Sequence, residues 1–108
     1  MTDYPEKTCE IDRLVSQSRL VKASLAGRKT EQRRDGIYAY PGETFELEGT
    51  VFEVVSVTRE RLGDMGEADA RAEGFDSLQQ YRDLILRMHR GMEWDEEHRV
   101  WVHRFRAR

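Results

Sequence analysis

The side chains with the greatest chemical potential gather in one short stretch, GRKTEQRR, which spans residues 27 to 34. The stretch contains one carboxylate, Glu31, and four cations, which are Arg28, Lys29, Arg33 and Arg34. A partly buried lysine amine loses its proton readily and becomes a nucleophile or a base, and a lysine also binds phosphate as a point charge. Arginines facing the same cleft would lower its pKa further. A solvated lysine in a charged loop is the alternative.

A second candidate is Glu73, which ends a short predicted helix just before Gly74. A carboxylate at this place can accept a proton or hold Lys29 in position. The alternative is a surface glutamate on a charged helix, and the spacing of the residues does not separate the two.

The three histidines and the single cysteine do not suggest a metal site or a thiol nucleophile. His98 and His103 are five residues apart on a predicted strand and so point to opposite faces, whereas zinc needs several convergent ligands. We therefore expect solvated or edge histidines, no metal and no cofactor. Cys9 falls on a predicted buried strand without an adjacent base, which favours a packed thiol. The sequence has no glycine-rich phosphate loop and no GxSxG motif.

Aromatic side chains beside cations can stack on unpaired bases. Tyr38, Tyr40 and Trp94 lie in predicted loops, and we take Tyr40 as the ligand-binding candidate, while Trp101 is assigned to the core. Packing of all these rings against the core is the alternative.

The composition sets limits on the class of protein. A chain of 108 residues forms one domain, here 1–108 with residues 1–7 as a loose end. Proteins that coat nucleic acid carry a net positive charge, whereas this chain has a net charge of -3, so any nucleic-acid contact is local. One cysteine allows no internal disulfide and indicates a reducing compartment. The polar start and the lack of an apolar stretch of about 20 residues predict a cytoplasmic protein without membrane contact.

The pattern of apolar residues and turn signals predicts an α+β domain. A helix over 19–26 ends at Gly27, Glu48-Gly49 joins two strands as a hairpin, and Ser77 caps a helix that Gly91 closes. The other expected elements are a strand over 8–14, a turn over 40–43, strands over 44–48 and 51–58, a helix over 67–73 and a strand over 98–106. The last strand has two apolar faces, which suits a central or barrel position, so we expect the strands to curl into a small β-barrel with flanking helices.

Several of these pieces, taken in order, resemble one known family. SLAGRKTEQRR, then YPGE, then ADARAEGF and a closing RVWVHRF strand are similar to the ASCH family, over roughly residues 9 to 105. The family signature of glycine-x-lysine followed by an arginine matches Gly27, Lys29 and Arg34. A second element, AEGF, matches residues 72–75. The resemblance implies a PUA-like β-barrel that binds RNA or a modified nucleoside or nucleotide in a cleft beside the Gly27–Arg34 loop.

The same resemblance implies catalysis in some members. One branch consists of small metal-independent amidohydrolases that act on acetylated cytidine through a lysine, a threonine and a glutamate. The lysine falls on Lys29 and the glutamate on Glu73, but the threonine position holds Gln32, and an amide cannot replace a reactive hydroxyl. Thr30, two residues earlier, is a possible substitute. Other members cleave single-stranded RNA, and others are binding modules only.

We therefore carry three hypotheses forward. The first is RNA or nucleotide binding through Gly27, Arg28, Arg33, Arg34 and Tyr40. The second is hydrolysis with Lys29, Glu73, Gln32 and Thr30 as catalytic candidates. The third is an interaction domain that docks a partner on the apolar stripe of the helix starting at Ser77. A monomer is expected, although the sequence leaves the oligomeric state open.

Overall fold

The computed structural model describes residues 4–89, 91 and 93–108. The expected loose end therefore lies partly outside the described residues, as does position 90 near the predicted end of the last helix. The helical elements are η1 Ile11–Arg13, α1 Ser18–Leu25, η2 Leu62–Asp64, α2 Glu67–Ala72 and α3 Leu78–Met88. The strands are β1 Glu31–Arg34, β2 Thr44–Leu47, β3 Thr50–Arg61 and β4 Arg99–Ala107.

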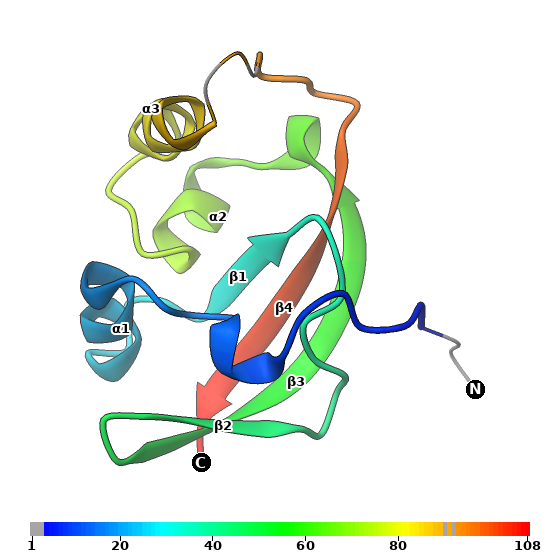
Figure 1. Cartoon of the computed structure of the whole chain (residues 1–108). Helices are drawn as coiled ribbons and strands as arrows, with labels where there is room; N and C mark the ends of the chain where they lie inside the picture. The colour runs from blue at the N-terminus through cyan, green and yellow to red at the C-terminus, as the bar shows by residue number, and fades with distance from the viewer. Residues whose placement is uncertain (1–3, 90, 92) are drawn as a thin grey trace.

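The four strands form one antiparallel sheet in the order β1-β4-β3-β2. The sheet curls, because the long strand β3 follows β4 over almost its whole length, bends across the molecule and carries a register shift between Val54 and Ser56 (Figure 1). The small α+β architecture is confirmed, and β4 is central as its two apolar faces predict. The expected closed barrel is not shown, since β1 and β2 remain the two edges of a curled half-barrel among the described residues.

Two predictions about strands were wrong. The stretch over 8–14 contains the 3₁₀ helix η1 rather than a strand, and an isolated bridge between Lys7 and Ile37 lies just before it. Its apolar residues are too few to sustain an alternating ladder, and the chain turns so that Leu14 reaches the core. The cationic stretch, expected as a loop, supplies strand β1, because its charged side chains find partners in the interior.

Most helix boundaries agree with their sequence signals, but α3 ends at Met88, before the Gly91 that was expected to close it. Gly27 follows α1 with a φ of 79°, and Gly74 follows α2 with a φ of 99°. Ser77 caps α3 by accepting a hydrogen bond from the Gln80 amide nitrogen at 3.1 Å. The Gln80 side chain does not complete a capping box with Ser77, because it accepts from the amide of Asp76 instead.

The helices gather at the β1 side of the sheet, where β1 faces α1 and α2 (Figure 1). Tight packing at Gly74 holds them there: a Cβ atom at this position would lie 3.4 Å from the Cβ atoms of Ala23 and Lys29. This packing brings the end of α2 against the start of β1. Among the described residues, no helix has both the length and the apolar character that crossing a bilayer would require.

Candidate functional site

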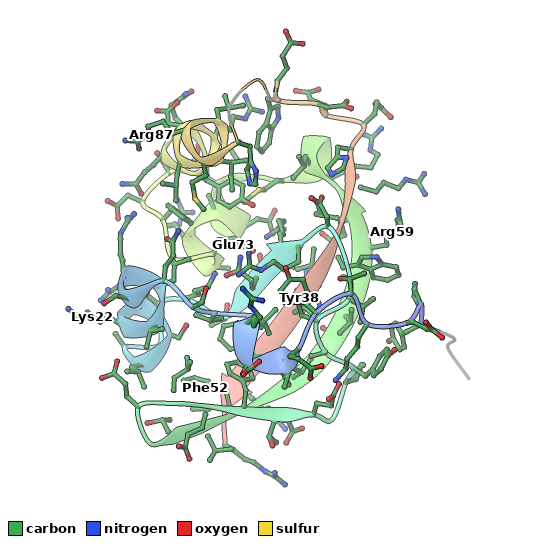
Figure 2. The ribbon with its side chains drawn as sticks, viewed as in Figure 1. Lys22, Tyr38, Phe52, Arg59, Glu73 and Arg87 are labelled. Atoms are coloured by element: carbon green, nitrogen blue, oxygen red, sulfur yellow. The ribbon has the colours of Figure 1, made fainter. Side chains whose placement is uncertain are left out.

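The residue pair that the sequence singled out, Lys29 and Glu73, meets in the interior. The Lys29 amine donates to the backbone oxygens of Glu31 at 2.7 Å and Glu73 at 2.8 Å, and to Glu73 Oε1 at 3.4 Å. Both side chains are almost completely buried, with exposed fractions of 0% and 1%. Figure 2 shows Glu73 between α2 and β1, whereas Lys22 and Arg87 project outward from their helices. The amine thus has three acceptors and no free donor position.

The buried pair continues into a chain of alternating charges. Arg33 Nη1 donates to Glu73 Oε2 at 3.0 Å and to Glu31 Oε1 at 2.8 Å. Arg104 on β4 contacts the other oxygen of Glu31 at 3.1 Å and Glu60 on β3 at 3.0 Å. Glu31 and Glu73 therefore each lie between two cations, and Glu60 is partly exposed to solvent. This pairing offsets the desolvation cost of the buried charges.

Burial shifts the titration of the two central groups toward each other. Loss of hydration lowers the pKa of Lys29, an effect that the neighbouring Glu73 carboxylate partly offsets. Loss of hydration also raises the pKa of Glu73, against the pull of Lys29 and Arg33. The two shifts act in the same sense, since each makes proton transfer from the lysine to the glutamate less unfavourable than between the free groups.

A cavity of about 610 Å³ lies beside this cluster, between β1, α1 and α3. Gln32, Arg33 and Glu73 form part of its wall, and Lys29 is not among the lining residues. Arg34 and Tyr38 contribute a cation–aromatic pair, with the guanidinium carbon 5.0 Å from the ring centroid. The remaining walls come from Thr8, Ser16, Gln17, Leu20, Asp35, Gly36, Leu62, Phe75, Tyr81, Leu84, Ile85, Met88, His89, His98 and Val100.

The structure brings together some of the candidate residues and leaves others apart. Lys29, Gln32, Arg33, Arg34 and Glu73 all lie at or directly behind the cavity wall. The remaining candidates do not line it: Gly27, Arg28 and Thr30 are exposed, and Tyr40 is elsewhere, donating its hydroxyl to Pro5 O at 2.9 Å. The amide of Thr30 is used to join β1 to α2 through Ala72 O at 2.7 Å.

Some cavity residues could not be assigned from the sequence. Tyr81 is 4% exposed, and burial together with the Glu73 carboxylate raises its pKa, so its hydroxyl stays protonated. His98 Nε2 lies 2.6 Å from Asp35 Oδ1 at the cavity wall. The apolar stripe of α3 points the same way, because Leu84 and Ile85 also line the cavity, while Met88 is 52% exposed. The helical spacing marks Tyr81, Leu84 and Ile85 only as one face of α3, and that this face lines a cavity depends on how the helix packs.

His103 contradicts the expectation of solvated or edge histidines. Its side chain is fully buried in the middle of the sheet. Nδ1 lies 3.2 Å from the carbonyl oxygen of Gln32, and Nε2 accepts from the amide of Tyr38 at 3.1 Å. Since a carbonyl can only accept, Nδ1 carries the proton and the ring is neutral. His103 therefore ties β4 to β1 and to the segment that carries Tyr38.

We expect the stability of the protein to fall as the pH is lowered from about 7 to 5, partly through His103. Burial lowers the pKa of His103 in the folded protein, whereas the unfolded ring titrates near pH 6.5. As the pH falls, the unfolded state takes up the proton first. The contribution of His103 to the free energy of unfolding is therefore fully present above about pH 6.5 and decreases below it, by at most about 1.4 kcal/mol per pH unit. Denaturant unfolding at several pH values measures this, and His103→Gln should give a flatter profile. Identical slopes for the two proteins would contradict the assignment.

No group of three or more histidine, cysteine, aspartate or glutamate side chains within the described part of the chain is placed to hold a metal ion. The site is defined instead by a buried charge cluster, on a small α+β domain with a curled antiparallel sheet, next to a cavity of ligand size. Among known proteins, no family model and no curated sequence matches the chain.

Solved structures do match. An ASCH domain from Lactobacillus crispatus JV V101 superposes with a TM-score of 0.61 at 18% identity, covering 82% of this chain and 69% of that one. Protein EF3133 from Enterococcus faecalis V583, of family DUF984, superposes with a TM-score of 0.57 at 13% identity, covering 83% and 67%. The chain thus has an ASCH-type fold, and the resemblance found in the sequence is confirmed for the fold.

Proposed function

We propose that this chain is a nucleotide-binding domain, which takes an RNA base or a modified nucleoside or nucleotide into the cavity beside β1. The observation that carries the proposal is the cavity itself: about 610 Å³, bordered by an uncompensated cation, an aromatic ring and buried polar groups. Its volume falls in the range of small-molecule sites. The likeness to ASCH domains agrees with this proposal, but at 18% identity it concerns the fold alone.

Charge distribution within the cavity favours an anionic ligand at Arg34. Arg33 is neutralised by Glu31 and Glu73. Arg34 instead donates to the carbonyl oxygens of Arg13 and Leu14, and it makes no ion pair with any described carboxylate. A cation held in place by carbonyls keeps its full charge for a ligand, and a phosphate is the group that a guanidinium binds best.

Arg34→Gln is therefore expected to weaken the binding of nucleoside monophosphates or short single-stranded RNA by about tenfold, and to reduce its dependence on salt. Arg28→Gln is the matched control, because it removes the same charge from the same stretch at an exposed position outside the cavity. Calorimetric titration at two salt concentrations measures both effects. Equal affinities for the wild type and Arg34→Gln would count against the proposed site.

A second candidate function is hydrolysis of the bound ligand, an acylated nucleoside amide first and single-stranded RNA second. The observation that favours it is the buried Lys29–Glu73 pair, whose pKa values are shifted toward each other and whose glutamate is among the residues around the cavity. Glu73 would move a proton to or from the ligand, and Lys29 would set the charge of Glu73. Against this candidate, the Lys29 amine has no free donor position.

A further inference from the structure

Tyr81 on α3 has a hydroxyl that neither the binding proposal nor the charge cluster uses. The residue is 4% exposed and belongs to the cavity wall. Its hydroxyl makes no hydrogen bond to a described residue, yet it is not among the buried polar atoms that the fold closes off from water. Gln32 Oε1 and Arg34 Nε are closed off in this way and do not reach a ligand. Because the cavity is the space that Tyr81 borders, its hydroxyl opens onto the cavity.

Aromatic packing fixes the direction of this hydroxyl. The ring centroid of Tyr81 lies 5.3 Å from that of Phe75 and 6.2 Å from that of Trp94, with interplanar angles of 84° and 89°. Edge-to-face contacts of this kind are a preferred geometry of aromatic pairs. The backbone is held as well, since the Tyr81 amide donates to Ser77 O at 3.1 Å in the first turns of α3. A ligand therefore meets a preorganised hydroxyl, which lowers the entropic cost of binding.

The hydroxyl keeps its proton and can therefore donate a hydrogen bond to a ligand. Burial, and after it the Glu73 carboxylate, raises the pKa of Tyr81, so the proton stays on the oxygen throughout the physiological range. With no described residue to accept this proton, water is its partner, and a ligand that displaces the water must bring an acceptor of its own. Glu73 is in the same wall and repels a second anion, so the complementary acceptor is neutral.

The side chains around this hydroxyl suit a nucleobase. Phe75, Leu84 and Ile85 form apolar parts of the same wall, which is the environment that a flat ring prefers. On such a ring a carbonyl oxygen projects beyond the outline, whereas the ring nitrogens lie within it, so a carbonyl reaches a hydroxyl in the wall first. Arg34 remains the partner of the phosphate, and the two contacts are made to different parts of the ligand.

We propose that Tyr81 is a specificity-determining residue, which selects nucleobases with a ring carbonyl by donating a hydrogen bond to the carbonyl oxygen. This inference rests on the proposed function of the cavity. Uracil, cytosine, guanine and hypoxanthine carry such a carbonyl, and adenine does not. Tyr81 thus holds the base, while Arg34 holds the phosphate.

The test compares inosine monophosphate with purine riboside monophosphate, which lacks the carbonyl oxygen, by calorimetric titration. The wild type is expected to bind the inosine form about tenfold more tightly, because the other ligand leaves the hydroxyl without its acceptor. Tyr81→Phe should weaken binding of the inosine form about tenfold and leave that of the purine riboside form nearly unchanged, so the preference falls to about twofold or less. Uridine monophosphate, against analogues in which either carbonyl oxygen is replaced by sulfur, repeats the comparison for pyrimidines. If the cavity binds only one ring size, the comparison of that size decides.

Tyr4→Phe is the matched control, because it removes one hydroxyl from a half-buried ring that packs on Tyr40 and Trp101 outside the cavity wall. This variant should retain the full preference. Tyr81→Phe keeps the ring and breaks no hydrogen bond to a described residue, so its unfolding midpoint without ligand should equal or exceed that of the wild type. A marked fall would reveal a partner for the hydroxyl inside the protein and would overturn the assignment.

The outcomes separate this inference from the proposal on which it rests. Binding of the paired ligands without preference would overturn the role of Tyr81 and leave the nucleotide site intact. An equal loss of affinity for both members of a pair in Tyr81→Phe would mean that the hydroxyl acts on the shape of the cavity, and would overturn it as well. Absence of binding for every ligand up to millimolar concentration would overturn the proposed function and this inference together.

Discussion

Glu73→Ala is expected to lower the free energy of unfolding by about 3–5 kcal/mol, the cost of removing one partner from a buried ion pair. Glu73 accepts from Lys29 and Arg33 at the same time, and its side chain is 1% exposed. Removing it leaves a buried ammonium and a buried guanidinium with one fewer counter-charge. Denaturant unfolding followed by circular dichroism measures the change, and the loss should be similar across moderate salt because water does not reach the pair.

Glu46→Ala is the matched control for this prediction. Glu46 lies exposed on β2, so its removal should change the free energy of unfolding by no more than about 0.5 kcal/mol. A cost below about 1 kcal/mol for Glu73→Ala would contradict the prediction, because it would mean that neither Lys29 nor Arg33 needs this counter-charge. Lys29→Met combined with Glu73→Ala would then cost no more than Lys29→Met alone.

Lys29→Met is expected to reduce any hydrolysis of acylated nucleosides by a factor of about 10²–10⁴, the usual contribution of a group engaged in proton transfer. The variant keeps most of the side-chain volume and removes the amine that contacts Glu73. Glu73 would keep Arg33 as its partner, which limits the loss of stability, and its protonation would change. Mass spectrometry of acetylated cytidine, related acylated nucleosides and a short single-stranded RNA, incubated with each protein, measures turnover.

Lys22→Met controls for the loss of a lysine, because Lys22 is exposed on α1. Turnover that persists in Lys29→Met would exclude the Lys29–Glu73 pair from the chemistry. Intact substrates with the wild type as well would remove the hydrolase candidate and leave nucleotide binding as the function to test. Lysine-dependent loss of an acyl group would establish an amidohydrolase in which Gln32 stands where the family resemblance expects a threonine.

Local signals in the sequence predicted the elements whose stability is itself local. The helix ending at Gly27 and the Glu48-Gly49 hairpin both depend on backbone conformations that glycine favours, and Gly27 and Gly49 both have positive φ. Strand β1 was missed because charged residues are poor strand signals on their own. Its charged side chains pair with Arg104 and Glu73, which lie far away in the sequence. The spacing of residues 27 to 34 cannot predict such distant partners.

The candidate site shows the same limit. Lys29 and Glu73 were chosen on chemistry and resemblance, and they meet although 44 positions separate them. Among the tyrosines, Tyr40 is the candidate from the sequence, but it is Tyr38 that lines the cavity. Both lie in the same connecting segment, two positions apart, and the difference between them is set by Arg34 packing over Tyr38. The burial of Gln32 depends on how β1 packs within the fold, which no signal in the sequence expresses.

The position of β1 at the edge of the sheet has a consequence for solubility. Open edge strands invite pairing with a second chain, which leads to aggregation. The carbonyl oxygen of Thr30 accepts a hydrogen bond from the amide of Phe105 on β4. Carbonyls alternate between the two sides of a strand, so those of Glu31 and Arg33 point away from β4, toward the open edge. Those of Glu31 and Arg33 already accept from Lys29 and Gln32. Two side chains of the cationic stretch therefore occupy acceptors that an intruding strand would need, so the contacts that hold β1 in place also limit self-association.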